Sequence, residues 1–504
     1  MRDTIVIDNF SDWASEGAFS KTEQPGRWCV LLGRYGATKG EVLYTPAGAH
    51  APTLSVNPEV AGWHDVRVRI YHGRYAVNDQ GYGLYMRSSR DPAFRILNME
   101  SDQECFEELY LGARDLTDAR MEIANFGRQC FIDCVRLTPT SDAERARRNR
   151  WREEPAEKEV AGIVDFADAA SDYLPDEACA AECARVHGEA GFTTVYWKAY
   201  AVRCEYHTQV GEVRSAKATG KLGTLLEQYD TLTTAVEAAH EVGLKIDGWM
   251  RISNEFDAPS GEWSKFAPTT PFHLAHPGAR MRSKDGRVQP KLSFAYPEVR
   301  EHKIAIAREI LEHGVDGLMI DVHRHPPMVM WDLPLVEAFI QETGEDPRQM
   351  EGDGTEAWLR FRARVFTTFL CELREMMATP GFEDKTLTVR THPWPWKCLR
   401  DGCDVAAWVD QGVVDAIIAS PHCGMPDGFP TVFDLGPMVQ LTQGKVRLLA
   451  NVWRMGVLHY AFALARQVYD QGADGVTLYE SNFLITQSDK RERVWSLRFP
   501  QIGG

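Results

Sequence analysis

Two carboxylic acids stand at the ends of apolar runs in the second half of the chain. Asp321 closes the run DGLMID, and Glu480 follows the run DGVTLY. A pair of carboxyl groups, one protonated and one ionised, supplies both partners of general acid–base catalysis. We therefore predict Asp321 and Glu480 as catalytic residues. The structural alternatives are that Asp321 pairs with a nearby arginine and that Glu480 caps a turn.

Other polar and aromatic side chains occupy similar positions. Indole rings suit stacking on the apolar face of a sugar. Arginines would bind a carboxylate or sulfate in bidentate fashion, or hold Asp321 ionised, and imidazoles would donate to hydroxyl groups or act as an acid. Asp247 lies deeper in its run and equally suits a structural ion pair. The predicted substrate-binding residues are Asp247, Trp249, Arg251, His323, Arg390, His392, Trp394, His422, Asn451 and Trp453.

The histidines allow a second interpretation, a metal-dependent hydrolase. Converging imidazoles could hold a divalent cation such as zinc that activates water. The candidate ligands are His323, His325, His392 and His422. The run that would form the first strand offers only Asp165, whereas the known amidohydrolases carry an H-x-H pair there. Our first interpretation therefore needs no cofactor.

Alternating strand and helix patterns explain how such residues would be brought together. Eight apolar runs alternate with amphipathic segments after about residue 160, which is the count of a (β/α)8 barrel. The active site of this fold lies at the C-terminal ends of the strands, and alternation decides which side chains face inward. A doubly wound sheet would need a Gly-rich first turn, which we do not find. The expected strands are 161–166, 193–200, 244–253, 316–323, 386–392, 414–420, 446–453 and 474–481.

The first part of the chain has a different pattern. Residues 1–140 contain about nine short period-two runs separated by turn residues, which predicts an all-β sandwich of jelly-roll type. Residues 141–160 are densely charged and predict a linker or surface helix, so 161–504 would be the barrel. The sandwich would be a carbohydrate-binding or interface module. Its aromatic residues could stack on glycan or form the core: Trp13, Trp28, Trp63, Tyr71 and Tyr82.

Composition limits the kind of partner. The 504 residues carry 72 acidic and 56 basic side chains, for a formal net charge of -16. Such a charge disfavours nucleic acid and anionic membranes as partners. The start of the sequence lacks a secretory pattern, and the 11 cysteines suit reduced thiols, so we expect a cytoplasmic protein, either monomer or homo-oligomer. Cys130/Cys134 and Cys179/Cys183 have C-x3-C spacing, which favours core packing over zinc binding.

The segment LSFAYPEVREHKIAIAREILEHGVDGLMIDVHRHPP (292–327) resembles the glycosyl-hydrolase-like barrel family. VDAIIASPHCG and GADGVTLYES are similar to that family's later strands. The resemblance implies a (β/α)8 fold and glycoside hydrolysis, often beside a sandwich module, and it places Asp321 at the family's strand-four acid. Strands five to seven lack an obvious second carboxylate, which is a departure from the expected pair.

We therefore predict a glycoside hydrolase acting on an oligo- or polysaccharide, with an acidic sugar as one substrate type. Glu480 opposite Asp321 would give a wide pair and inversion, whereas a closer loop acid such as Glu205, Glu255 or Asp427 would suit retention. Residues 201–228 and 254–298 would build the pocket. Besides the metal-dependent hydrolase, a sugar-binding protein without catalysis is a further alternative.

Overall fold

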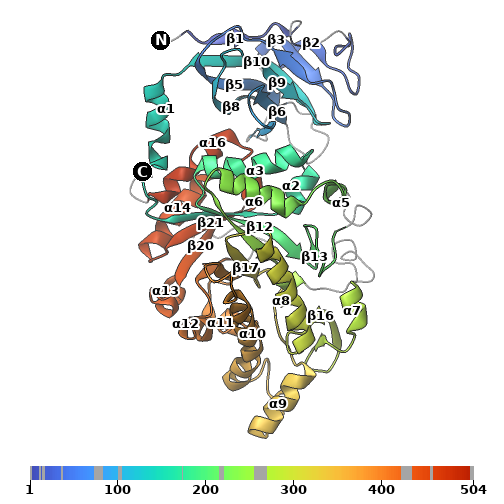
Figure 1. Cartoon of the computed structure of the whole chain (residues 1–504), viewed down its shortest axis with the longest axis vertical. Helices are drawn as coiled ribbons and strands as arrows, with labels where there is room; N and C mark the ends of the chain where they lie inside the picture. The colour runs from blue at the N-terminus through green and yellow to red at the C-terminus, as the bar shows by residue number, and fades with distance from the viewer. Residues whose placement is uncertain are drawn as a thin grey trace. The chain divides into compact units, whose positions relative to one another are not determined.

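The computed structural model describes most of the chain as two compact units (Figure 1). Unit 1 comprises Met1–Pro155, Asp172–Gly191 and Asn482–Trp495, and unit 2 comprises Ala156–Ser171, Phe192–Ser481 and Ser496–Gly504. The residues described are 3–10, 13, 17–35, 38–72, 83–99, 105–172, 174–214, 221–254, 270–421, 434–454 and 458–499.

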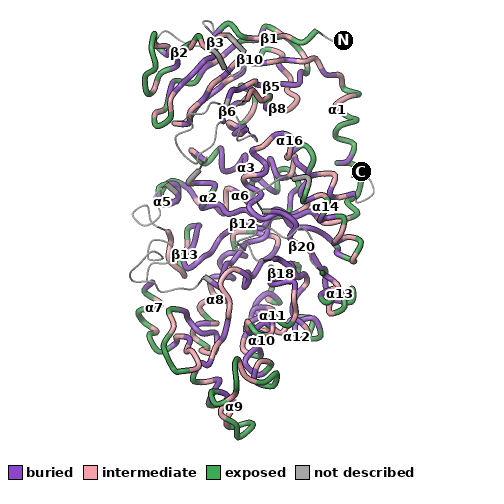
Figure 2. Tube along the Cα trace, turned by 180° about the vertical axis from the view of Figure 1, so that it is seen from behind, coloured by how far each residue is buried: buried purple, intermediate pink, exposed green. Residues whose placement is uncertain are grey.

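Unit 2 contains a closed barrel of eight parallel strands, as the sequence predicts. The strands follow one another around the barrel, and β11 pairs with both β21 and β12, which closes the ring. In a view from behind, the strands labelled β12, β18 and β20 are buried along most of their length (Figure 2). The barrel strands are β11 (Glu159–Val164), β12 (Thr194–Ala201), β14 (Lys245–Met250), β17 (Gly317–Asp321), β18 (Thr386–Thr391), β19 (Ala416–Ala419), β20 (Arg447–Arg454) and β21 (Gly475–Tyr479).

Helices between the strands cover the barrel. The longest of them, α10, begins at Thr355, whose side chain accepts from the backbone N–H of Trp358. A short strand and a hairpin extend the loops: β13 (Arg203–Cys204), β15 (Arg280–Arg282) and β16 (Val288–Leu292). The helices are α2 (Phe166–Asp172), α5 (Lys221–Leu226), α6 (Thr231–Glu241), α7 (Pro271–Ala275), α8 (Pro297–Glu312), α9 (Leu333–Thr343), α10 (Glu356–Met377), α11 (Pro395–Arg400), α12 (Val405–Asp410), α13 (Gly436–Thr442) and α14 (Leu458–Asp470).

Unit 1 is built on two antiparallel sheets. One has the order β2-β3-β10-β5-β8, with β1 beside β10, and the other has the order β4-β9-β6-β7. Apolar side chains of both sheets form a single core. The strands are β1 (Ile5–Ile7), β2 (Cys29–Tyr35), β3 (Thr38–Thr45), β4 (Leu54–Val56), β5 (Trp63–His72), β6 (Gly83–Ser88), β7 (Arg95–Asn98), β8 (Cys105–Asp115), β9 (Met121–Ala124) and β10 (Cys130–Pro139).

The aromatic residues proposed for glycan stacking in unit 1 mostly have other partners. Trp13 and Trp28 are 1% and 0% exposed and belong to the core. Trp63 is partly exposed, but the Arg145 guanidinium lies 3.7 Å from its ring centroid. Tyr71 packs against Phe106, and Tyr82 lies outside the described residues. The core alternative therefore holds for Trp13 and Trp28.

The charged segment after β10 folds locally. Ser141 and Glu144 form a capping box at the start of α1 (Asp142–Asn149), a helix that buries no residue. Trp151 follows in a short 3-10 turn and is buried, with its ring stacked on Trp495 at 6.0 Å. The segment thus contains a surface helix and an aromatic anchor.

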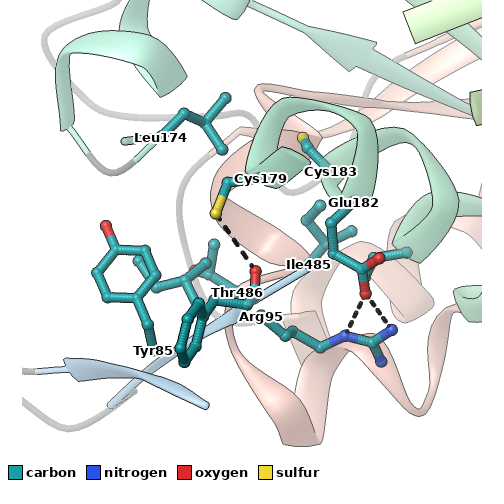
Figure 3. Close-up of a pocket in the computed structure, with 11 residues that line it drawn as sticks. Tyr85, Arg95, Leu174, Cys179, Glu182, Cys183, Ile485 and Thr486 are labelled. Carbon is teal, nitrogen blue, oxygen red and sulfur yellow. Dashed lines mark hydrogen bonds and ion pairs between the residues drawn. The ribbon is translucent and has the colours of Figure 1, made fainter. Parts of the chain in front are cut away.

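Unit 1 also includes helix α3 (Glu177–Ala190), α15 (Ser481–Leu484) in part, and α16 (Ser488–Arg491). Cys179 and Cys183 lie one turn apart on α3, and both are buried. They line a cavity of about 20 Å³, where the Arg95 guanidinium from β7 meets the Glu182 carboxylate (Figure 3). This volume accommodates about one water molecule, so the cavity is part of the packing and too small for a substrate.

Two further observations concern the cysteines and the apolarity of the helices. Ten cysteines lie among the described residues, and none of these ten is joined in a disulfide. In the same described ranges, no helix combines the length and apolarity that crossing a bilayer requires.

Candidate functional site

The barrel interior is lined by alternate residues of each strand. Ile163, Tyr196, Trp249, Met319 and Tyr479 are among the side chains that meet in one buried cluster in the lumen. Residues two positions further along the same strands must therefore face the same way, toward the C-terminal mouth. This agrees with the inward orientation predicted for Trp249 and Arg251 on the third strand and for Asp321 on the fourth.

Asp321 is the centre of a hydrogen-bond cluster at the mouth. Its Oδ2 accepts from Trp249 Nε1 at 3.1 Å and from Arg390 NH1 at 3.0 Å, and its Oδ1 accepts from the His323 backbone N–H at 2.9 Å. The carboxylate is completely buried. An ionised carboxylate offers about four acceptor positions, so the three hydrogen bonds leave about one for a water molecule or a substrate hydroxyl.

Of the two roles that the sequence left open for Arg390, its contacts match the one beside Asp321. Its guanidinium is divided between Asp321 and the Ser420 hydroxyl, which accepts from NH2 at 3.0 Å. Its planar face also lies 4.4 Å from the ring centroid of Tyr479. Because Arg390 is fully buried with these partners, it positions Asp321, and the predicted contact with a substrate carboxylate does not fit.

A second buried ion cluster lies on the first three strands. Lys198 of β12 donates to Asp165 at the end of β11, and Arg251 NH1 lies 3.3 Å from the other oxygen of Asp165. Burial opposes ionisation of Asp165, but the charges of Lys198 and Arg251 outweigh it and lower its pKa. Asp165 is therefore an ionised structural centre that orients two cations toward the mouth.

Glu205, one of the loop acids considered for a retaining reaction, lies in the same network. Its Oε1 is 3.3 Å from Lys198 Nζ and 3.2 Å from Arg214 Nε. The Glu205 side chain is completely buried, so its charge is balanced by these cations. Glu255 and Asp427, the other two loop candidates, lie outside the described residues.

Asp168 is a candidate site residue that the sequence patterns did not indicate. It lies one helical turn after Asp165, in the first turn of α2, and is exposed to solvent. Partial burial and the negative charges of Asp165 and Glu480 raise its pKa to about 6, although Lys198 and Arg251 act in the opposite direction. The available signal was the spacing D-F-A-D directly after a barrel strand, because residues three apart at a helix start share a face.

Glu480 directly follows β21, and its backbone conformation is unusual. Its φ is 58°, in the left-handed region that non-glycine residues rarely adopt, and its side chain is buried. Such strain is often found at functional sites. The left-handed turn breaks the alternation after Tyr479, which explains why the sequence left the direction of Glu480 open.

The indole rings differ in their availability. Trp249 is fully buried and uses its N–H for Asp321, and Trp453 is only 4% exposed, so neither presents an open face. Trp394, at the start of α11, is partly exposed and stacks on His392 with centroids 6.5 Å apart. Trp396 is 60% exposed. Stacking on a sugar therefore fits Trp394 and Trp396 better than Trp249 or Trp453.

The other predicted substrate contacts that the structure describes are also buried. His323 and His392 have ring centroids 4.7 Å apart, and both are almost completely buried. Asn451 accepts from the Thr477 hydroxyl at 3.0 Å inside the barrel.

Asp247 lies at the opposite end of the barrel from the predicted site. It lines a recess of about 740 Å³ together with the first residues of several strands, including Glu159, Lys245, Thr386 and Arg447. Alternation gives the correct face of the strand but not the height along the barrel. Asp247 is therefore removed from the substrate-binding set.

Asp247 nevertheless makes a testable contribution to stability. Burial and the charges of Glu159 and Asp316 raise its pKa to about 7. The folded protein keeps a proton that the unfolded chain releases near pH 4, so stability falls as the pH rises from about 4 to about 7. Asp247→Asn should then increase the free energy of unfolding at pH 8 by on the order of 3 kcal/mol. Urea denaturation at pH 8 and at pH 4.5 measures this.

The control for this prediction is internal to the experiment. At pH 4.5 Asp247 is already protonated when folded, so the wild type and Asp247→Asn should be nearly equal in stability. An equal difference at both pH values would show that the carboxyl group does not titrate as described.

The metal interpretation finds little support in the described geometry. Within the described ranges, no group of three or more His, Cys, Asp or Glu side chains is arranged to hold a metal ion. His325 is partly buried beside the cations of Arg324, Lys291 and Arg251, and burial and these charges lower its pKa to about 4. His422 lies outside the described residues. A cationic neighbourhood is unfavourable for binding a further cation.

Comparisons with known proteins agree with this architecture. Residues 181–421 match the family model named Glycosyl hydrolase-like 10. No curated protein matches the chain.

Among solved structures, the chain is similar to the catalytic domain of β-amylase from Paenibacillus polymyxa, with 11% sequence identity. The match covers 69% of this chain and 99% of that chain, and its TM-score is 0.48. It is also similar to the PgaB (BpsB) glycoside hydrolase domain from Bordetella bronchiseptica, with 11% identity, coverage of 67% and 98%, and a TM-score of 0.45.

The family match spans β12 to β19 and includes Asp321, the residue on which the sequence resemblance depended. The protein thus contains a closed barrel of eight parallel strands, and its residues 181–421 are similar to the Glycosyl hydrolase-like 10 family.

Proposed function

We propose that the protein is a glycoside hydrolase that acts on an oligo- or polysaccharide at the C-terminal mouth of the barrel. The observation that carries this proposal is the contrast between two carboxyl groups there. Asp321 is surrounded by hydrogen-bond donors, whereas Asp168 is crowded by other carboxylates. A carboxyl group whose pKa is raised by neighbouring carboxylates suits the role of proton donor in such a pair.

In this proposal the residues have separate roles. Asp168 donates a proton to the departing oxygen, and its solvent exposure gives a substrate access to it. Asp321 is the ionised carboxylate that activates water or attacks the sugar. Glu480, predicted as the second catalytic acid, instead helps to keep Asp168 protonated through its negative charge.

A screen for product formation tests the function. The wild type would be incubated with neutral and acidic oligosaccharides, and new reducing ends would be followed together with product masses. The proposal requires a cleaved glycosidic bond that is formed by the wild type and lost in Asp321→Asn. Binding of a glycan without any cleavage would identify a sugar-binding protein instead.

The pH dependence tests the role of Asp168. Because the acid must be protonated, kcat/KM of the wild type should fall above a pH of about 6. Asp168→Asn should lower turnover by about 10²- to 10⁴-fold and abolish this alkaline decline. The measurement is a pH–rate profile of both proteins on the substrate that the screen identifies.

Two comparisons separate this role from a structural one. Aryl glycosides with an acidic leaving group need little protonation, so Asp168→Asn should retain more activity on them than on an alkyl glycoside. Asp168→Glu should restore part of the pH dependence. An unchanged alkaline limb in Asp168→Asn would assign the proton transfer to another residue.

A further inference from the structure

Three arginines surround the phenol ring of Tyr479 at the mouth of the barrel. Arg324 NH1 donates to the Tyr479 hydroxyl at 3.0 Å, and Arg390 lies over the ring at 4.4 Å. Arg251 lies 5.6 Å from the ring centroid of Trp249, and that indole in turn meets Tyr479 at 6.0 Å. The three guanidinium groups come from β18 and from the residues directly after β14 and β17.

These arginines differ in how their charge is balanced. Arg390 is bound to Asp321 at 3.0 Å, and Arg251 approaches Asp165 only through NH1, at 3.3 Å. Within the described part of the chain, no carboxylate lies within 4.0 Å of Arg324, whose single hydrogen bond is the one to Tyr479. A guanidinium group has five N–H donors, so Arg324 retains four of them.

Arg251 contributes further unused donors. The residue is 8% exposed, and its Nε is buried without a hydrogen-bond partner. A buried donor of this kind costs free energy unless a partner arrives. The NH2 group of Arg251 also has no partner among the described residues. Arg251 and Arg324 thus both have N–H donors without a partner among the described residues, and the charges of both act on Tyr479.

Two further basic side chains lie near Arg324, whereas Arg251 also feels the negative charges of Asp165, Glu205 and Asp321. Lys291 donates to the backbone carbonyls of His325 and Pro327 just after Arg324, and it is 7% exposed. His325, between these groups, carries no charge at neutral pH because burial and the cations of Arg324, Lys291 and Arg251 lower its pKa to about 4. The negative charge of Asp321 acts on His325 in the opposite direction, and Arg390 already engages that carboxylate.

We propose that Arg324 and Arg251 form a subsite beside Tyr479 that binds the carboxylate of a uronic acid residue. Planar guanidinium groups match a carboxylate in bidentate geometry, and the buried setting strengthens the charge-assisted hydrogen bonds. This inference rests on the proposed function, since it names the substrate class of the same barrel mouth. It also replaces the sequence-based expectation that Arg390 binds the acidic group.

The test measures binding and does not depend on turnover. D-Glucuronate and D-galacturonate would be titrated by calorimetry at constant ionic strength, with D-glucose and D-galactose as neutral counterparts. The wild type should bind each uronate at least about tenfold more tightly than its neutral analogue. Arg324→Gln should lose most of this preference while its affinity for the neutral sugars stays unchanged.

Two further variants complete the design. Arg324→Lys keeps the charge but not the bidentate geometry, so it should retain part of the preference and serves if Arg324→Gln does not fold. Arg364→Gln is the matched control, because Arg364 is 65% exposed and lies on α10. It should behave as the wild type.

The outcomes are distinct. A wild type that binds neither uronate, or that does not prefer uronates, would overturn the subsite, and so would an Arg324→Gln variant that keeps the preference. A protein that prefers uronates but cleaves no glycoside would keep the subsite and lose the proposed function. A protein that cleaves neutral oligosaccharides but does not prefer uronates would keep the proposed function and lose the subsite.

Discussion

Asp321→Asn is expected to lower turnover by at least about a thousandfold. The substitution removes the negative charge that the proposed reaction needs. It also places an amide N–H₂ against donors, since Trp249, Arg390 and His323 all donate to this carboxylate. Steady-state kinetics on the substrate found by the screen, at a temperature where circular dichroism shows the variant folded, measures the effect.

A matched variant separates charge from hydrogen bonding. Trp249→Phe removes one of the three donors to Asp321 but keeps the carboxylate and most of the ring that fills the lumen. It should change kcat by no more than about tenfold. Near-normal turnover of a folded Asp321→Asn would remove this residue from the mechanism and leave it as a partner of Arg390.

Arg95→Met is expected to reduce the free energy of unfolding of unit 1 by about 3–5 kcal/mol. Arg95 is buried and lies within 2.5 Å of Glu182 and 2.9 Å of Glu189, both on α3. Its removal leaves Glu182 almost completely buried, with the more distant Arg185 at 4.0 Å. An uncompensated buried charge is far more costly than the loss of a surface ion pair. Urea denaturation followed by tryptophan fluorescence measures the change.

The double variant Arg95→Met, Glu182→Met provides the control. Two apolar side chains of similar volume would then face the cavity beside Cys179 and Cys183, where no charge remains on either partner. Replacing a buried ion pair in this way often restores stability. The double variant should therefore be more stable than Arg95→Met alone. A further loss of stability would indicate that Glu182 has another essential partner.

The sequence predicted much of the barrel because its strands and helices have local signatures. The eight expected strands all form, and their alternation correctly placed Trp249, Asp321 and Arg390 in the lumen. In a parallel barrel the outward positions must be apolar to meet the helices. The polar residues at alternate positions could therefore only face inward.

The candidate site was predicted less completely, and the errors have a common cause. Periodicity reports which face of a strand a residue occupies, but not its height in a staggered barrel or its partner across the lumen. Asp247 therefore lies on the predicted face of its strand, but at the end of the barrel opposite the mouth. Trp249 and Arg390 face the mouth, yet Asp321 already engages both of them.

The sequence by itself determined the fold class, the inward set of strand residues and the position of Asp321. Local patterns suffice for these features, because hydrophobic burial acts on every strand and helix in the same way. Only the tertiary structure decided that Asp168 is crowded by Asp165 and Glu480, and that Arg324 has no carboxylate partner among the described residues. Both features depend on distances between side chains that the fold brings together. The strength of an electrostatic interaction follows those distances, and not the order of residues in the chain.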